Sequence, residues 1–258
     1  MAPARPNTEP DRWATDDRGP LNLLNLLNLL NLLNFLNLLN LIYLLNMLTH
    51  WFFDLDGTLA RTGEDIVIAW KGALKALGRD LSRFDEVFSI GPTLEKVVYE
   101  LYPDATPELV AALLERFKPL YDESGFPNTV PYPGVPEMLA ALKARGAKIY
   151  IVTNKRHAPT QGIAKKFGWD RLFDGVWSYD SLEVKYRKPD LLARLLRELA
   201  VDPAAAVMVG DTKGDVDAGK ANGMSTIGVT YGYGTREELA AADRVFEQAS
   251  DIANFQTK

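Results

Sequence analysis

The chain of 258 residues contains no cysteine and only two histidines, His50 and His157. Without cysteine it can form no disulfide, hold no zinc through thiolates and use no thiolate nucleophile. Two histidines are also too few for a histidine-rich metal site. A resident metal would therefore have to be a hard cation with oxygen ligands, which favours Mg²⁺.

The sequence also lacks any block of positive charge. It has 29 Lys and Arg against 34 Asp and Glu, which gives a net charge of −5. This balance gives no reason to expect binding to nucleic acid or to an anionic membrane surface. With 47% hydrophobic and 24% charged residues, the composition is that of a globular protein. The length suits one large domain or two small ones.

Residues 1–48 differ from the rest of the chain. Residues 1–20 carry four prolines and seven charged side chains, and we expect them to be disordered. Residues 21–48 consist mostly of leucine, with asparagine at every third position from Asn22 to Asn40. On a helix each three-residue step turns by about 300°, so the asparagines drift around the axis and leave no stable apolar face. We therefore expect a low-complexity extension without a catalytic role, and not a coiled coil.

The leucine-asparagine tract is uncharged and long enough to span a bilayer. However, an amide at every third residue is costly in hydrocarbon, and no Lys or Arg cluster flanks the tract closely. A secretory signal would need a basic start and an unbroken apolar core, and neither is present. We expect a cytoplasmic protein, and membrane association through residues 21–48 stays open as the alternative.

Two acids separated by one residue follow an apolar run. Residues 51–53 read as a short buried strand, and Asp54 and Asp56 come directly after it, before Gly57. Side chains i and i+2 of an extended strand share a face, and two carboxylates there repel unless a cation or a proton separates them. Such a pair suits phosphoryl chemistry, in which one Asp attacks phosphorus and the other handles the leaving group's proton. By itself, the motif could also be an acidic turn that caps a helix.

Three further motifs follow in order along the chain. Thr153 and Asn154 end a β-rich run, and both can donate hydrogen bonds to a phosphate oxygen. Lys188 stands just before a predicted helix start, because proline at the next position suits a first helical turn. Asp211 and Asp215 follow another apolar run. In parallel α/β sheets, sites form at the carboxyl ends of strands, so these groups can converge.

The motifs DxDGTL, TN, KP and GDxxxD, in this order, resemble those of the haloacid dehalogenase superfamily of aspartyl-phosphate phosphohydrolases. The resemblance extends from about residue 50 to the C-terminus. It implies an α/β fold, a doubly wound parallel sheet with an inserted small α-helical cap. We expect the catalytic core over residues 49–61 and 132–258, where strands and helices alternate, and the helical cap over residues 62–131.

The resemblance also implies a role for each motif residue. Asp54 would be the nucleophile, and Asp56 would protonate the leaving group and later deprotonate water. Dehalogenases and phosphonate hydrolases of the superfamily lack an acid at the position of Asp56, so its presence favours phosphate esters. We expect Arg156 and His157 to be solvated. The catalytic set would be Asp54, Asp56, Thr153 and Lys188, the substrate-binding set Gly57, Asn154 and Lys188, and the Mg²⁺ ligands Asp54, Asp56 through its backbone carbonyl, Asp211 and Asp215.

Two further segments, residues 89–94 and 230–239, resemble the phosphoglycolate phosphatase-like branch, which also contains pyrophosphatases and nucleotidases. The first segment could equally be an ordinary glycine-proline turn. The resulting hypothesis is a Mg²⁺-dependent phosphatase for a small phosphorylated metabolite, with no nucleic-acid partner. One alternative is a phosphoglucomutase-like phosphotransferase. Another is a membrane or assembly protein with an idle catalytic domain, against which the retention of every core acid argues.

Overall fold

The computed structural model describes residues 23–45, 48–253 and 255, so the disorder expected for residues 1–20 lies outside the described residues. The chain divides into two compact units between Leu45 and Asn46. The first unit contains one described element, α1 (Leu23–Leu45). The second unit contains all the motifs identified above.

The helix α1 is continuous, and the apolar side chains from Leu24 to Leu38 are exposed. Leu24 and Phe35 are 59% and 57% exposed, and the leucines between them are similarly accessible. No side of the helix is predominantly apolar, because asparagine recurs at every third position. Across the part of the chain that the structure describes, no helix combines the length and the hydropathy needed to cross a membrane.

The second unit is built on a six-stranded sheet in the order β5-β4-β1-β6-β7-β8. All neighbouring strands are parallel, which confirms the predicted α/β fold class. The register places Phe53 of β1 between Ile151 of β4 and Val209 of β6, so the first motif lies at the centre of the sheet. The strands are β1 (His50–Phe53), β4 (Lys148–Thr153), β5 (Gly175–Ser178), β6 (Ala206–Gly210), β7 (Ser225–Val229) and β8 (Arg244–Phe246).

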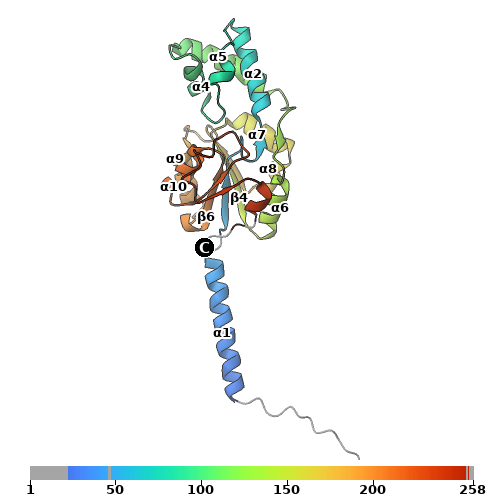
Figure 1. The fold of residues 1–258 in the computed structure, drawn as a ribbon, viewed down its shortest axis with the longest axis vertical. Helices are drawn as coiled ribbons and strands as arrows, with labels where there is room; N and C mark the ends of the chain where they lie inside the picture. Colours follow the sequence, from blue (N-terminus) through green and yellow to red (C-terminus); the bar gives the residue numbers. More distant parts are fainter. Residues whose placement is uncertain (1–22, 46–47, 254, 256–258) are drawn as a thin grey trace, which may run out of the picture. The chain divides into compact units, whose positions relative to one another are not determined.

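Helices cover both faces of this sheet, with α9 and α10 on one side of β4 and β6 and α6 on the other (Figure 1). Successive strand residues point to opposite faces. Phe52 therefore packs in the cluster that includes α9 and α10, whereas Trp51 and Phe53 pack in the cluster that includes α6 and α7. Burial on both faces explains why the strands are apolar at nearly every position. The helices that accompany the sheet are α6 (Val135–Ala144), α7 (His157–Lys166), α8 (Trp169–Leu172), α9 (Lys188–Glu198), η1 (Pro203–Ala205), α10 (Lys213–Ala221) and α11 (Ala249–Ile252).

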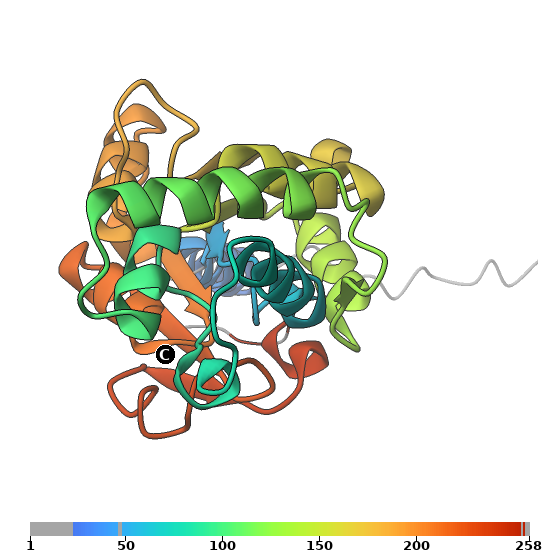
Figure 2. The same cartoon turned by 90° about the horizontal axis from the view of Figure 1, so that it is seen from above.

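Four helices are inserted between two short antiparallel strands, β2 (Ala60–Arg61) and β3 (Val130–Pro131). Trp70 of α2 and Phe117 of α5 pack with ring centroids 4.4 Å apart and form the centre of this insertion. Figure 2 shows α5 (green) running in front of the core when the molecule is seen from above. The inserted helices are α2 (Gly63–Ala76), α3 (Phe84–Val87), α4 (Leu94–Leu101) and α5 (Pro107–Asp122). Helical patterning of the sequence over residues 66–77, 94–101 and 107–121 predicts the three longer helices but not α3.

Candidate active site

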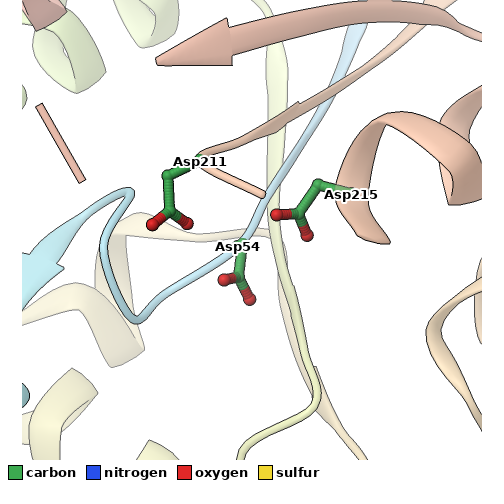
Figure 3. Close-up of side chains that lie close together, drawn as sticks. All are labelled: Asp54, Asp211 and Asp215. Carbon is green, nitrogen blue, oxygen red and sulfur yellow. The ribbon is translucent and has the colours of Figure 1, made fainter. Parts of the chain in front are cut away.

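Three buried carboxylates meet where β1 and β6 end. Asp54 follows β1, Asp211 follows β6 and Asp215 lies in the first turn of α10, and Figure 3 shows their side chains gathered around one point. One oxygen of each lies within 4.8 Å of the others. The parallel pairing of the two strands causes this convergence. The pairing of the two strands continues past the end of β1 through a 3.0 Å hydrogen bond from the Asp54 N–H to the Val209 carbonyl.

Lys188 supplies the positive charge beside these carboxylates. It is the first residue of α9, with Pro189 in the first turn as the sequence predicted, and its side chain is 5% exposed. Its ammonium lies 2.8 Å from Asp54 Oδ1 and also contacts Asp215 Oδ1. Burial by itself would lower the pKa of Lys188, but the two carboxylates outweigh this effect and raise it. The lysine is therefore fully charged.

The N-terminus of α10 is capped by Thr212 and Asp215, and not by Asp211. Thr212 is the N-cap residue, and its N–H and hydroxyl donate to Asp215 Oδ2 at 3.0 and 2.7 Å. Asp211 lies just before the cap. Its oxygens accept hydrogen bonds from the Thr58 hydroxyl at 3.2 Å and from the Tyr233 N–H at 2.7 Å.

The acid cluster carries more negative charge than Lys188 can neutralise. Burial raises the pKa of Asp54 to about 6, although Lys188 opposes the shift. Burial, with the charges of Asp215 and Asp54, raises the pKa of Asp211 to about 8. A divalent cation among the three would remove this repulsion, and an all-oxygen donor set is the kind that Mg²⁺ prefers. The residues present therefore fit the expected metal.

The side chains of Asp54 and Asp56 have different polar partners. The strand β1 ends at Phe53, and the chain then turns. Asp56 accepts a 2.6 Å hydrogen bond from the Thr62 hydroxyl. It also accepts hydrogen bonds from the Lys155 ammonium at 2.9 and 3.1 Å. Each acid of the motif thus has its own lysine.

Gly57 makes possible the turn that directly follows Asp56. Its φ is +86°, a value that residues with a side chain rarely adopt. A Cβ atom here would lie 2.0 Å from Asp211 Oδ2. Gly232 and Gly234 also pack against Asp211, where a Cβ would come within 2.4 and 1.9 Å of its atoms. At these three positions a larger residue would collide with Asp211, so each requires glycine.

A cavity of about 190 Å³ opens above these groups. Among the predicted site residues, Asp54, Asp56, Thr153, Asn154 and Lys188 line it, whereas Gly57, Asp211 and Asp215 do not. The helical insertion contributes a largely apolar wall and the whole segment 89–94. The apolar residues of this wall are Ile66, Trp70, Phe88, Ile90, Leu94, Val97, Leu114 and Phe117.

Several contacts in the site were not predicted. Arg156 was expected to be solvated, but its side chain is 16% exposed and its guanidinium pairs with Asp122 at the end of α5. His157 is exposed as expected. The sequence contained a signal for Lys155, which directly follows the TN motif, and for Tyr233, which lies in the segment 230–239.

Comparisons with known proteins agree with this geometry. The model of the haloacid dehalogenase-like hydrolase family matches residues 51–229. A phosphoglycolate phosphatase from Psychrobacter arcticus is 30% identical over 217 residues, which cover 80% of this chain and 94% of the relative. A 5'-nucleotidase from Pseudomonas aeruginosa is 33% identical over 195 residues, which cover 73% and 86%. The crystal structure of a predicted phosphoglycolate phosphatase from Haemophilus somnus 129pt superimposes with a TM-score of 0.69 at 27% identity, over 79% of this chain and 96% of that one.

The chain therefore belongs to the haloacid dehalogenase-like hydrolase family. Within it, the chain is similar to phosphoglycolate phosphatases, and it is a phosphoric monoester hydrolase. The matched segment begins at Trp51, so the leucine-asparagine tract lies outside it.

Proposed function

We propose that this protein is a Mg²⁺-dependent phosphatase that hydrolyses a small phosphomonoester through an aspartyl-phosphate formed on Asp54. The main support is the position of Asp54. It is buried beside Lys188 in the group of three acids, and it lines the cavity that the insertion closes. In this proposal residues 62–131 act as the cap that encloses the substrate, and residues 49–61 and 132–258 form the catalytic core.

In the first step an Asp54 oxygen attacks phosphorus and the bond from phosphorus to the leaving oxygen breaks. Asp56 gives its proton to that oxygen, so the leaving group departs as a neutral alcohol. Thr153, Asn154, Lys188 and the backbone N–H groups near Gly57 donate hydrogen bonds to the phosphoryl oxygens. Asp54, Asp211, Asp215 and the Asp56 carbonyl would hold Mg²⁺, which when bound neutralises charge between Asp54 and the phosphoryl group.

In the second step water attacks the phosphorus of the aspartyl-phosphate. Asp56, now a carboxylate, takes a proton from this water, and the Asp54–phosphorus bond breaks. Inorganic phosphate leaves and both acids return to their starting states. The same residue thus serves as acid and then as base, which requires its side chain to stay beside the leaving oxygen throughout.

The substrate class in this proposal follows from the cavity and the relatives. A space of about 190 Å³ admits a small metabolite ester. Relatives named phosphoglycolate phosphatase and 5'-nucleotidase make 2-phosphoglycolate and nucleoside 5'-monophosphates the first candidates. The proposal keeps the cytoplasmic location expected for an enzyme that acts on a phosphorylated metabolite.

The test is a screen for inorganic phosphate release from 2-phosphoglycolate, nucleoside monophosphates, pyrophosphate and β-glucose 1-phosphate. We expect turnover of at least one of the phosphate monoesters with Mg²⁺ and none with EDTA. Formation of glucose 6-phosphate without phosphate release would support the phosphotransferase instead. Turnover that persists unchanged in EDTA would refute the metal-dependent mechanism.

A further inference from the structure

Lys155 is almost fully enclosed although it carries a charge. Its side chain is 5% exposed, and its ammonium lies 2.9 and 3.1 Å from the two oxygens of Asp56. A buried ammonium is costly unless it is paired, so the two side chains hold each other in place. Removal of either one would leave the other as an uncompensated charge.

The backbone fixes Lys155 in this position. Its N–H donates a 3.2 Å hydrogen bond to the Thr153 hydroxyl, and its carbonyl accepts a 3.1 Å hydrogen bond from the N–H of Tyr179. Both bonds hold the turn that follows β4. The lysine therefore reaches Asp56 from a turn that is held by two backbone hydrogen bonds directly after β4.

The same ammonium also contacts the helical insertion. It lies 4.5 Å from the centroid of the Tyr121 ring in α5, a cation–π distance. Tyr121 is 2% exposed, and its hydroxyl has no hydrogen-bond partner within the described part of the chain. Asp56, Lys155 and Tyr121 all line the cavity. This chain of contacts joins the catalytic acid to the wall that the insertion provides.

From this geometry we propose that Lys155 is a positioning residue for the leaving-group side of the reaction. It holds the Asp56 carboxyl group toward the leaving oxygen and places a positive charge beside that oxygen as the bond to phosphorus breaks. Tyr121 keeps the ammonium in place from the side of the insertion. Lys188 serves the nucleophile Asp54 in the same way, so one lysine is assigned to each side of the phosphoryl group. The inference rests on the proposed function.

The experiment compares kcat/KM for p-nitrophenyl phosphate, whose leaving group needs little protonation, with kcat/KM for an alkyl phosphate that the enzyme accepts. Lys155→Met keeps a similar length and removes the charge. We expect Lys155→Met to lower kcat/KM for the alkyl ester by a factor that is ~10-fold or more larger than the factor for p-nitrophenyl phosphate. This difference is a part of the ~10²–10⁴-fold rate increase that general acid catalysis supplies. Lys155→Arg should restore much of the difference. Lys165→Met, at an exposed position on α7, should match the wild type.

A second pair of variants tests the contact with the insertion and does not remove the buried charge. Tyr121→Leu removes the ring and should shift the ratio of the two kcat/KM values in the same direction as Lys155→Met, by a smaller factor. Tyr121→Phe keeps the ring and should leave the ratio unchanged. Circular dichroism checks that each variant is folded.

Equal losses for the good and the poor leaving group in folded Lys155→Met, or no loss for either, would overturn the inference. If Lys155→Met does not fold, an unchanged ratio in Tyr121→Leu would overturn the role of the insertion in placing the ammonium. Failure of the proposed function would give a different result, because the wild-type enzyme itself would then show no Mg²⁺-dependent phosphate release.

Discussion

Tyr233 donates its backbone N–H to Asp211 Oδ2 at 2.7 Å, and so links a carboxylate of the acid cluster to the loop after β7. The hydroxyl of the same tyrosine accepts hydrogen bonds from the N–H groups of Thr62 and Gly63, at 2.7 and 2.6 Å. These two N–H groups lie where the chain enters α2. One residue thus joins the candidate metal site to the start of the helical insertion.

Tyr233→Phe should therefore destabilise the protein, because it leaves two enclosed N–H donors without their acceptor. We expect a loss of ~1–3 kcal/mol in the free energy of unfolding, the usual cost of unsatisfied buried donors. Urea denaturation measures this loss. Tyr99→Phe, at an exposed tyrosine of α4, is the matched control and should change stability little. Equal stability of the two variants would contradict the structural role of the Tyr233 hydroxyl.

Asp54→Asn should abolish turnover, because a neutral amide is a poor nucleophile for phosphorus and a weak ligand for Mg²⁺. The measurement is phosphate release under saturating substrate and Mg²⁺. Loss of the native ion pair with Lys188 is a possible structural effect, so circular dichroism of the variant is the control. If the variant kept ~10% or more of the wild-type kcat, the ~10-fold loss would be too small for a lost nucleophile, and the assignment would be wrong.

Asp56→Asn should bind substrate and turn it over slowly. It keeps the backbone carbonyl for the metal but loses proton transfer, which is worth ~10²–10⁴-fold in rate. It also loses the ion pair with Lys155, so circular dichroism of the variant is the control. The loss of kcat/KM should be smaller for p-nitrophenyl phosphate than for an alkyl phosphate. An equal loss for both esters would count against protonation of the leaving group by Asp56.

Without metal, the stability of the protein should fall as pH rises from about 4 to about 8. The pKa of Asp54 is raised from 3.8 to about 6 and that of Asp211 from 3.8 to about 8, so in this window the native state binds more protons than the unfolded state. The stability gained from these two protonated groups is present at low pH and is lost as pH passes through the native values. Mg²⁺ binds the charged forms, so its stabilising effect should grow with pH.

Thermal unfolding in EDTA and in excess Mg²⁺ at several pH values tests this prediction. Asp211→Asn is the control, because it removes the group with the larger shift and should flatten the metal-free dependence between about pH 6 and 8. The same slope in the variant and the wild type would show that Asp211 does not cause the pH dependence.

The leucine-asparagine tract should be dispensable for catalysis. Every motif residue lies after Leu48, and the tract has no acid, base or cation to add to a site. A shortened chain should begin at Met47, because Leu48 is buried in the core and its carbonyl accepts a hydrogen bond from Trp51. We expect unchanged Mg²⁺-dependent kcat/KM. We also expect less self-association than in the full chain, because association buries the exposed leucines of the tract.

Light scattering and kinetics on the two chains measure these effects. A shortened chain that is folded by circular dichroism but has lost most of its activity would show that the tract contributes to the enzyme. Partition of the full chain into bilayers, with none for the shortened chain, would favour the membrane alternative.

Much of the fold was predictable from local signals. The apolar runs that form β1, β4 and β6 are buried on both faces, and each ends in polar residues, so both their positions and their parallel arrangement could be predicted. The elements of the second unit that were missed contain two to four residues each, and they are α3, α8, η1, α11, β2, β3 and β8. Such short elements show no periodic pattern, and contacts elsewhere in the chain determine them.

The candidate site also has a part that the sequence predicts and a part that only the tertiary structure shows. The sequence by itself determined which acids and which lysine gather at the strand ends, because parallel strands bring their carboxyl ends to one edge. Only the tertiary structure decided that Asp56 leaves this group and pairs with Lys155, which is 99 residues away along the chain. A turn at Gly57 and the burial of an ammonium under Tyr121 determine that pairing. A charge that is shielded from water is stable only when it is paired with an opposite charge. Tertiary packing decides which opposite charge lies close enough, and the spacing of residues in the sequence does not show it.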